Sequence, residues 1–316
     1  MSQSHYFRGV LLICLSALCW SSAGLLIKII SLPPIQIALY RSFVAGVFLT
    51  GYVVYSKKKF NIPFQFTITR WSVITALCYV FTVSLFVIAN KLTTSANAVF
   101  LQYTAPIYVI LITFFILKEK VYAVEIATVF ICLGGMMLLF MDEEKSTALA
   151  GNIFGILSGI AFAILQISVK KSEQNASAPM TAQSNISGIF NLAFGNIVTV
   201  VVLGIAVTVV YALSASYSTS PLFSIFGNSF SLTSSDIFGL VFLGVFQLGL
   251  GYLFFAKGAK YISNVEIAIY TLLEPILNPV WTFLGTGEFP GFWAILGGGL
   301  VLSAIVVNTV FRKNEA

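Results

Sequence analysis

The chain has 316 residues, of which 58% are hydrophobic and 9% are charged, with a net charge of +6. Soluble domains carry roughly 45–50% apolar and about 25% charged residues, so this composition excludes an ordinary soluble protein and indicates an integral membrane protein. The sequence has one histidine and no Walker-type lysine loop, which excludes histidine triads, ordinary histidine metal sites and direct use of ATP.

Apolar runs recur along the chain, and a helix needs roughly 20 such residues to cross the hydrocarbon core. The runs lack the alternating pattern of a membrane β-barrel, so helices are expected throughout. In chain order the predicted spans are 9–30, 34–55, 71–90, 95–117, 121–141, 151–171, 183–212, 237–257, 263–284 and 291–311. The predicted fold class is an all-α integral membrane protein with ten transmembrane helices.

Two segments, 89–120 and 256–288, look like copies of one element. They align when Pro106 is placed on Pro275, and in both segments a glutamate follows 13 residues after the proline. Internal duplication on this scale is a primary clue to the architecture of a chain.

A second pair of segments, 16–28 and 158–170, agrees with this alignment through a serine-to-lysine interval of 12. We therefore expect two domains, 1–144 and 145–316, each a five-helix repeat. An odd number of helices per copy inserts the second copy upside down, which gives the inverted repeat typical of secondary transporters.

Lysine and arginine predict the orientation of the spans. With the N-terminus inside, thirteen basic residues fall in cytoplasmic segments and three fall outside. Both termini are therefore expected in the cytoplasm, and the protein in a bacterial inner or plasma membrane. The net charge is explained by this bias, so no nucleic-acid partner is expected.

Pro106 and Pro275 lie inside predicted spans, where each removes a backbone donor and frees a carbonyl four residues earlier, at Gln102 and Thr271. Irregular backbone at membrane depth is tolerated only against protein or a water-filled cavity. Since both copies carry the proline, these kinks are predicted to flank a central cavity. The alternative is a kink that serves packing alone.

Ionisable groups within spans cost roughly 2.5–3.5 kcal/mol on insertion scales and mark functional positions. Glu274 is the deepest carboxylate and is expected to bind a proton or a cationic part of a substrate, with a structural pair to Arg41 or a lysine as the alternative. Glu266 and Tyr270 precede it at spacings of four, which would put all three on one helix face. Glu266 is the second candidate coupling residue, with an interfacial pair to Lys260 as the alternative. Arg41, in the second span, is interpreted as structural.

Polar and aromatic side chains within the spans could present ring faces and amides to a small organic solute. Most aromatic residues are expected to pack or face lipid, since Phe alone numbers 29. The candidate lining residues are Trp20, Tyr79, Asn97, Gln102, Tyr103, Gln166, Asn185, Gln247, Tyr252, Tyr270 and Glu274.

Several residues carry a family resemblance. Trp20 is followed eight residues later by Lys28, Arg41 lies in the second span, and residues 94–106 read TSANAVFLQYTAP before the Lys-Glu-Lys at 118–120. With its two five-span copies, the chain resembles the EamA-like branch of the drug/metabolite transporter superfamily. The resemblance implies ten helices and favours export.

We expect a secondary transporter that moves a small polar or amphipathic metabolite, such as an amino acid, by alternating access that proton exchange could drive. The expected partners are this solute and the lipid bilayer, with no cofactor, metal or catalytic residue, in a monomer or homodimer. Two alternatives stay open: an intramembrane enzyme acting on a lipid or isoprenoid substrate, and a multidrug exporter of the same fold. The enzyme would need clustered acids, and the acidic run at 142–144 is followed by no second motif.

Overall fold

A computed structural model describes residues 3–61, 67–141, 148–174, 186–217, 225–226, 232–286 and 291–313. All regular elements with bounds given below are helices, and no strand occurs within these ranges. Part of the predicted link between the two repeats, the lining candidate Asn185 and the repeat residue Glu288 lie outside the described residues.

The first half of the chain contains broken and continuous helices. Its elements are α1 (Gln3–Trp20), α2 (Ala23–Ile29), α3 (Pro34–Lys59), α4 (Arg70–Leu92), α5 (Ser95–Gln102), α6 (Ala105–Leu111), the π-helix η1 (Ile112–Ile116) and α7 (Ala123–Leu139).

The second half follows a similar order. Its elements are α8 (Leu149–Gln174), α9 (Ser187–Tyr217), α11 (Ser234–Phe242), the π-helix η2 (Leu243–Leu250), α12 (Gly251–Ala259), α13 (Asn264–Thr271), α14 (Leu273–Thr286) and α15 (Phe292–Lys313).

Seven helical stretches of the described chain are long and apolar enough to cross a membrane, and Ala123–Leu139 is a shorter apolar helix. The seven are Pro34–Lys59, Arg70–Leu92, Ser95–Ile116, Leu149–Gln174, Ser187–Ala212, Ser234–Ala259 and Phe292–Phe311. The chain is therefore a multi-pass helical membrane protein, which confirms the predicted all-α class. The count of ten spans and the inverted repeat stay predictions.

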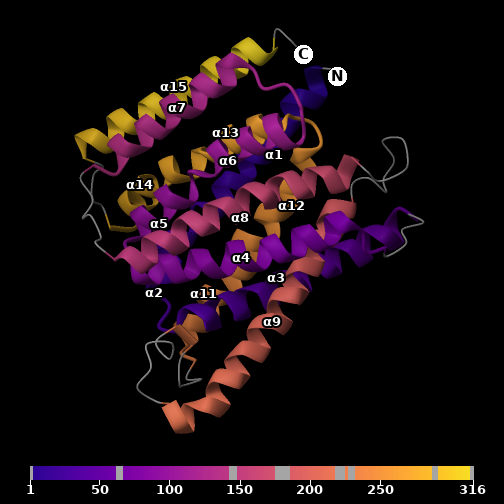
Figure 1. Ribbon diagram of the computed structural model, residues 1–316, viewed down its shortest axis with the longest axis vertical. Helices are drawn as coiled ribbons and strands as arrows, with labels where there is room; N and C mark the ends of the chain where they lie inside the picture. The colour runs from indigo at the N-terminus through magenta and orange to yellow at the C-terminus, as the bar shows by residue number, and fades with distance from the viewer. Residues whose placement is uncertain are drawn as a thin grey trace.

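The helices form a layered bundle in which α4 lies beside α8, and α7 lies beside α15 along one edge (Figure 1). The two chain ends lie close together at one end of this bundle (Figure 1). Gly297 on α15 allows a close approach to α7, because a Cβ there would overlap the Gly135 carbonyl oxygen. Small residues at contacts of this kind are typical of helix packing in membranes.

Two helix breaks occur at the predicted prolines. The helices α5 and α13 end at Gln102 and Thr271, and each proline then lies in the first turn of the following helix, where its missing N–H leaves no gap. The hydroxyl groups of Thr104 and Thr271 donate to carbonyls three residues earlier, at 2.7 Å and 2.8 Å. The breaks are thus stabilised locally.

Candidate functional site

A small buried cavity lies where the broken helices meet. The centre of a water molecule can occupy about 30 Å³ of it. Sites that hold small organic ligands measure roughly 300–1,000 Å³, so in this conformation the cavity is too small to hold such a ligand. The lining residues are Trp20, Arg41, Thr82, Val83, Phe86, Gln102, Tyr103, Phe162, Gln247, Leu248, Tyr252 and Glu274.

Six predicted lining residues border this cavity, and all lie at or beside interruptions in the α-helices. Trp20 is the last residue of α1, and Gln102 is the last residue of α5, directly before Tyr103. The other three are Gln247 within η2, Tyr252 just after η2, and Glu274 as the second residue of α14. Broken helices and π-helical turns aim side chains and free backbone groups at a common point, which is typical of functional sites in transporters.

Glu274 and Tyr103 join the two proline breaks directly. The Tyr103 hydroxyl donates to the Oε2 of Glu274, and both side chains are buried. None of the described lysine and arginine side chains forms an ion pair with Glu274. The cavity therefore contains a carboxyl group whose hydrogen-bond partner is a phenol and whose charge is not neutralised by a neighbouring cation.

Arg41 places a guanidinium group in the same cavity wall. Its Nη2 donates to the Val83 carbonyl oxygen at 2.9 Å and its Nη1 to the Gln247 Oε1 at 3.4 Å. The Nε of Arg41 is buried without a hydrogen-bond partner. The sequence favoured a structural role for this residue, neutralising a carboxylate or holding a helix end, although an arginine within a span was itself a signal of function.

Aromatic rings form another wall of the cavity. The ring of Trp20 lies 5.5 Å from that of Phe162 and 4.9 Å from that of Tyr252, centroid to centroid. Gly251 leaves room for the indole, because a Cβ there would approach Trp20 Nε1 to 2.5 Å. Phe162 was not among the predicted lining residues, although it follows Ser158 by the interval that separates Trp20 from Ser16.

A family model described as the EamA-like transporter family matches residues 7–141 and 201–310. The chain belongs to the EamA-like transporter family. This confirms the predicted resemblance and gives membrane transport as the general function.

Curated relatives of this EamA-like protein are also transporters by name. It is 23% identical to the uncharacterized transporter YxxF of Bacillus subtilis strain 168, over 100% of this chain and 94% of the relative. An uncharacterized transporter of Archaeoglobus fulgidus is 22% identical over 95% of this chain and 96% of its own length. The uncharacterized inner membrane transporter YhbE of Escherichia coli K12 is 26% identical over 51% of this chain and 52% of its own length.

A known crystal structure shares the fold. It matches the EamA-like chain with a TM-score of 0.74 at 15% identity, over 98% of this chain and 99% of the other. At this identity the match shows the fold alone.

Two predicted lining residues, Tyr79 and Gln166, lie behind the cavity wall. The ring of Tyr79 is 5.1 Å from that of Tyr252, and its hydroxyl donates to the Asn196 Oδ1 at 3.0 Å. Gln166 lies one turn along α8 from Phe162 and is buried with neither amide atom hydrogen-bonded. Neither residue borders the cavity in this conformation.

Asn97 lies farther away, in the first turn of α5. Its Nδ2 donates to the Thr93 Oγ1 at 2.9 Å and to the Oδ1 of Asn152 on α8. These contacts connect α5 with α8 near their ends. Asn97 therefore contributes to the helix packing of this conformation and does not border the cavity.

Tyr270 and Glu266 belong to a separate polar cluster. The Tyr6 hydroxyl donates to Glu266 Oε1 at 2.9 Å and lies 3.0 Å from the Tyr270 hydroxyl. Glu266 also caps α13, since its Oε2 accepts from the Ser263 N–H at 2.8 Å. The expected common face with Glu274 assumed a continuous helix, whereas the break after α13 turns Glu274 into the cavity and leaves the other two outside it.

Proposed function

We propose that the protein is a ten-helix secondary transporter that moves a small polar or amphipathic metabolite, such as an amino acid, by alternating access. One observation carries the proposal. A buried carboxyl group, Glu274, and a buried guanidinium group, Arg41, border the same cavity without forming an ion pair with each other.

Charge complementarity supports this substrate class. A guanidinium group with an unsatisfied N–H is a strong donor to a carboxylate, and the Nε of Arg41 is such a donor. Glu274 offers an acceptor for an ammonium group, and the rings of Trp20, Phe162 and Tyr252 offer apolar and cation–π surface for the remainder of the solute. A zwitterion with a compact side chain would satisfy both charges at once.

Alternating access is supported by the origin of the lining residues. Both expected repeats, 1–144 and 145–316, contribute to the cavity, and their proline breaks meet at the bond between Tyr103 and Glu274. Inverted repeats have two related packings that open one central site to either side of a membrane. A cavity too small for a substrate is expected in a conformation between those two packings.

Proton coupling would use Glu274. A single carboxyl group with no cation neutralising it can bind a proton in one conformation and the ammonium group of a substrate in the other. Such an exchange links proton movement to substrate movement, because each ligand shifts the conformational equilibrium by its differential affinity. Export across an inner membrane is the proposed direction, supported by the family resemblance. The bias of basic residues supports the placement of both termini in the cytoplasm.

The test is binding followed by flux. Purified protein is screened by thermal shift against amino acids, their amides and their deaminated analogues, since a ligand of the native state raises its stability. The best ligand is then tested for saturable counterflow in proteoliposomes. We expect zwitterions to bind more tightly than either analogue. Equal binding of all three classes, or flux without saturation, would defeat the proposal.

An alternative substrate class is also supported by the aromatic wall. Organic cations are recognised by tryptophan and tyrosine rings together with a carboxylate, which would make the protein a multidrug exporter of the same fold. The positive charge of Arg41 in the cavity wall would repel a cationic substrate that carries no anionic group. A lipophilic cation such as tetraphenylphosphonium in the same thermal-shift screen separates the two classes.

A further inference from the structure

The seven-residue helix α2 is joined to the cavity by a break directly after Trp20. We propose that α2 is a gate on this side of the cavity, hinged at Ser21 and Ser22 and positioned by Trp281. The inference rests on the proposed alternating access. It predicts which segment moves, and this movement can be measured without a substrate.

The hinge is a stable interruption of the helix. The Ser21 hydroxyl donates to the Leu18 carbonyl at 2.7 Å, and the Ser22 hydroxyl donates to the Cys19 carbonyl at 3.0 Å. These bonds satisfy carbonyl groups near the end of α1, which lack partners at a helix end. The segment can therefore rotate at the break without leaving buried carbonyls unpaired.

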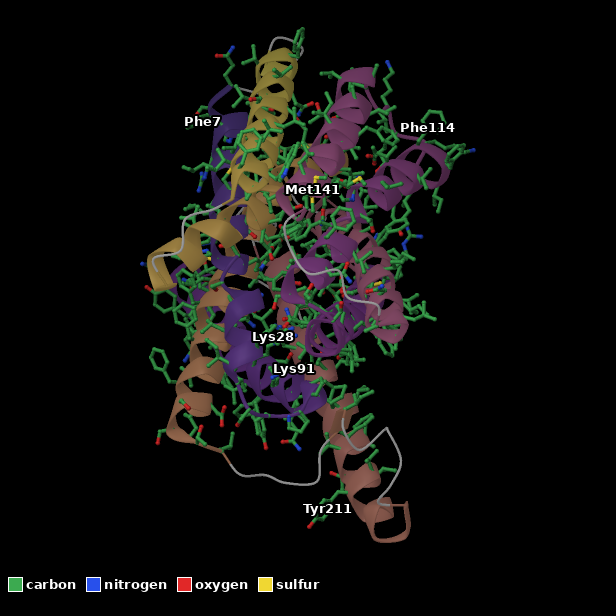
Figure 2. The ribbon with its side chains drawn as sticks, turned by 90° about the vertical axis from the view of Figure 1, so that its left-hand side faces the viewer. Phe7, Lys28, Lys91, Phe114, Met141 and Tyr211 are labelled. Carbon is green, nitrogen blue, oxygen red and sulfur yellow. The ribbon has the colours of Figure 1, made fainter. Side chains whose placement is uncertain are left out.

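Two reciprocal lysine bonds hold the far end of α2. The Lys28 Nζ donates to the Thr93 carbonyl, just past α4, and the Lys91 Nζ donates to the Ile30 carbonyl, just past α2, both at 2.6 Å. Figure 2 shows Lys28 and Lys91 close together, with Phe7 and Phe114 toward the opposite end of the molecule. Cations near the carbonyl ends of helices are favourably placed. We call this pair the lysine latch.

Asp236 adds a third connection from another helix. Its carboxylate accepts the Ser31 N–H at 2.9 Å and the Ser31 hydroxyl at 2.8 Å, and it also accepts from Thr233 at the start of α11. Since α11 leads into η2, which carries the cavity-lining residue Gln247, this contact connects the end of α2 to another part of the cavity wall. In this conformation α2 is held at both ends.

Trp281 connects the hinge to the cavity carboxylate. Its Nε1 donates to the Ser21 Oγ at 2.7 Å, and it lies on α14, which begins beside Glu274. If α14 moves when Glu274 exchanges a proton for a substrate, Trp281 moves with it, and so does the hydrogen bond that Trp281 donates to Ser21 at the hinge. The counterpart of α1 and α2 in the second half is α8, which continues without a break from Leu149 to Gln174. The hinge is present in only one of the two halves.

The test measures a distance across the proposed gate by pulsed electron paramagnetic resonance. The four native cysteines, Cys14, Cys19, Cys78 and Cys132, are replaced by alanine. Spin labels are placed at Ile29 on α2 and Leu149 on α8, which are 64% and 71% exposed. In Lys28→Met/Lys91→Met we expect a second population, longer by about 5 Å or more, the rise of one helical turn.

Controls separate gate opening from general disruption. Lys58→Met removes an exposed lysine elsewhere and is expected to leave the distance unchanged, as is a second label pair at Phe7 and Phe114 in the latch variant. Asp236→Asn provides an independent way to loosen the end of α2 if the double variant does not fold. An unchanged Ile29–Leu149 distance in whichever latch or Asp236 variant folds would overturn the proposal.

Trp281→Phe tests the positioning contact, since it keeps an aromatic ring and removes the N–H donor. Glu274→Gln is expected to shift the populations of the Ile29–Leu149 distance when Trp281 is present. In the Trp281→Phe background we expect less than half of that shift. An equal shift in both backgrounds would show that Trp281 does not position the gate. If the populations respond as expected but no substrate is transported, the gate stands and the proposed function fails.

Discussion

The two proline breaks have a similar backbone arrangement, but the side chains beside them differ in chemistry. At each break the helix ends four residues before the proline, yet the residue directly before Pro106 is Ala105 and the residue directly before Pro275 is Glu274. The first break instead provides Tyr103, whose hydroxyl donates to that glutamate. The cavity thus forms where two similar breaks meet, and each break contributes a different polar side chain to it.

The first break is also more firmly held than the second. The Gln102 Nε2 donates to the Ser158 Oγ at 2.7 Å, and Ser158 donates in turn to the Thr82 carbonyl at 3.1 Å. At the matching place, Thr271 bonds within its own helix, and the hydroxyl of Ser16 is buried without a partner. We infer that the break carrying the carboxylate is the one with more freedom to move.

The largest effect is expected for Glu274→Ala. Hydrogen bonds to charged groups contribute about 1.5–3 kcal/mol, so loss of the carboxylate should weaken zwitterion binding by roughly 10- to 150-fold. Binding of the deaminated analogue should change little, because it lacks the ammonium group. Titration of both ligands by thermal shift checks this, with Glu266→Ala as the carboxylate control outside the cavity. An equal loss for both ligands would contradict the assigned role.

Arg41→Gln should produce the complementary loss. We expect roughly tenfold weaker binding of the zwitterion, about 1.4 kcal/mol, and little change for the amide that lacks a carboxylate. The same titrations measure it. Arg41 would be structural, as the sequence suggested, if both ligands bound normally to a variant that unfolds at a lower temperature.

Tyr103→Phe sharpens the comparison between the breaks by removing only their connecting bond. When Glu274 carries a proton, this is a hydrogen bond between neutral groups, which contributes about 0.5–1.5 kcal/mol, so the affinity or transport rate that depends on this state should change by roughly 2- to 10-fold. Tyr79→Phe is the matched control, because that hydroxyl lies behind the cavity wall. Identical effects of the two substitutions would remove the special role of the bond to Glu274.

The smallest effects are expected for two substitutions that change the free energy of unfolding. Gln102→Leu breaks the bond to Ser158 and leaves a buried hydroxyl group with one partner fewer, which should lower the free energy of unfolding by about 1 kcal/mol. Thr271→Val, at the second break, should cost less, since its bond is local. Thermal unfolding of both variants in detergent compares them, and a larger loss for Thr271→Val would reverse the assignment of the firmer break.

The sequence predicted the helical class, the family and the interruption of the helices at the two prolines. Hydrophobic run length and repeated spacing are local signals that can be read without the fold. Six of the candidate lining residues, chosen as polar or aromatic side chains within apolar runs, border the cavity, and their contact with a substrate stays a prediction. The sequence did not predict the break at Ser21 and Ser22, which carries no proline or glycine and is supported by a contact from Trp281, distant in the sequence. It also grouped Tyr270 with Glu274, because a spacing of four puts two residues on one face of a continuous helix. That spacing does not apply across the break after α13.

The most direct test concerns Glu274 as the exchangeable group of the site. Proteoliposomes containing the parent protein or Glu274→Gln are loaded with the best ligand from the screen, and its flux is measured with and without an imposed proton gradient. The flux through the parent protein should increase when the proton gradient is imposed. The Glu274→Gln variant should fold and retain the cavity, but its flux should not respond to the gradient. A Glu274→Gln protein with unchanged affinity, rate and gradient response would contradict the account, and Glu266 would then be the next carboxylate to test.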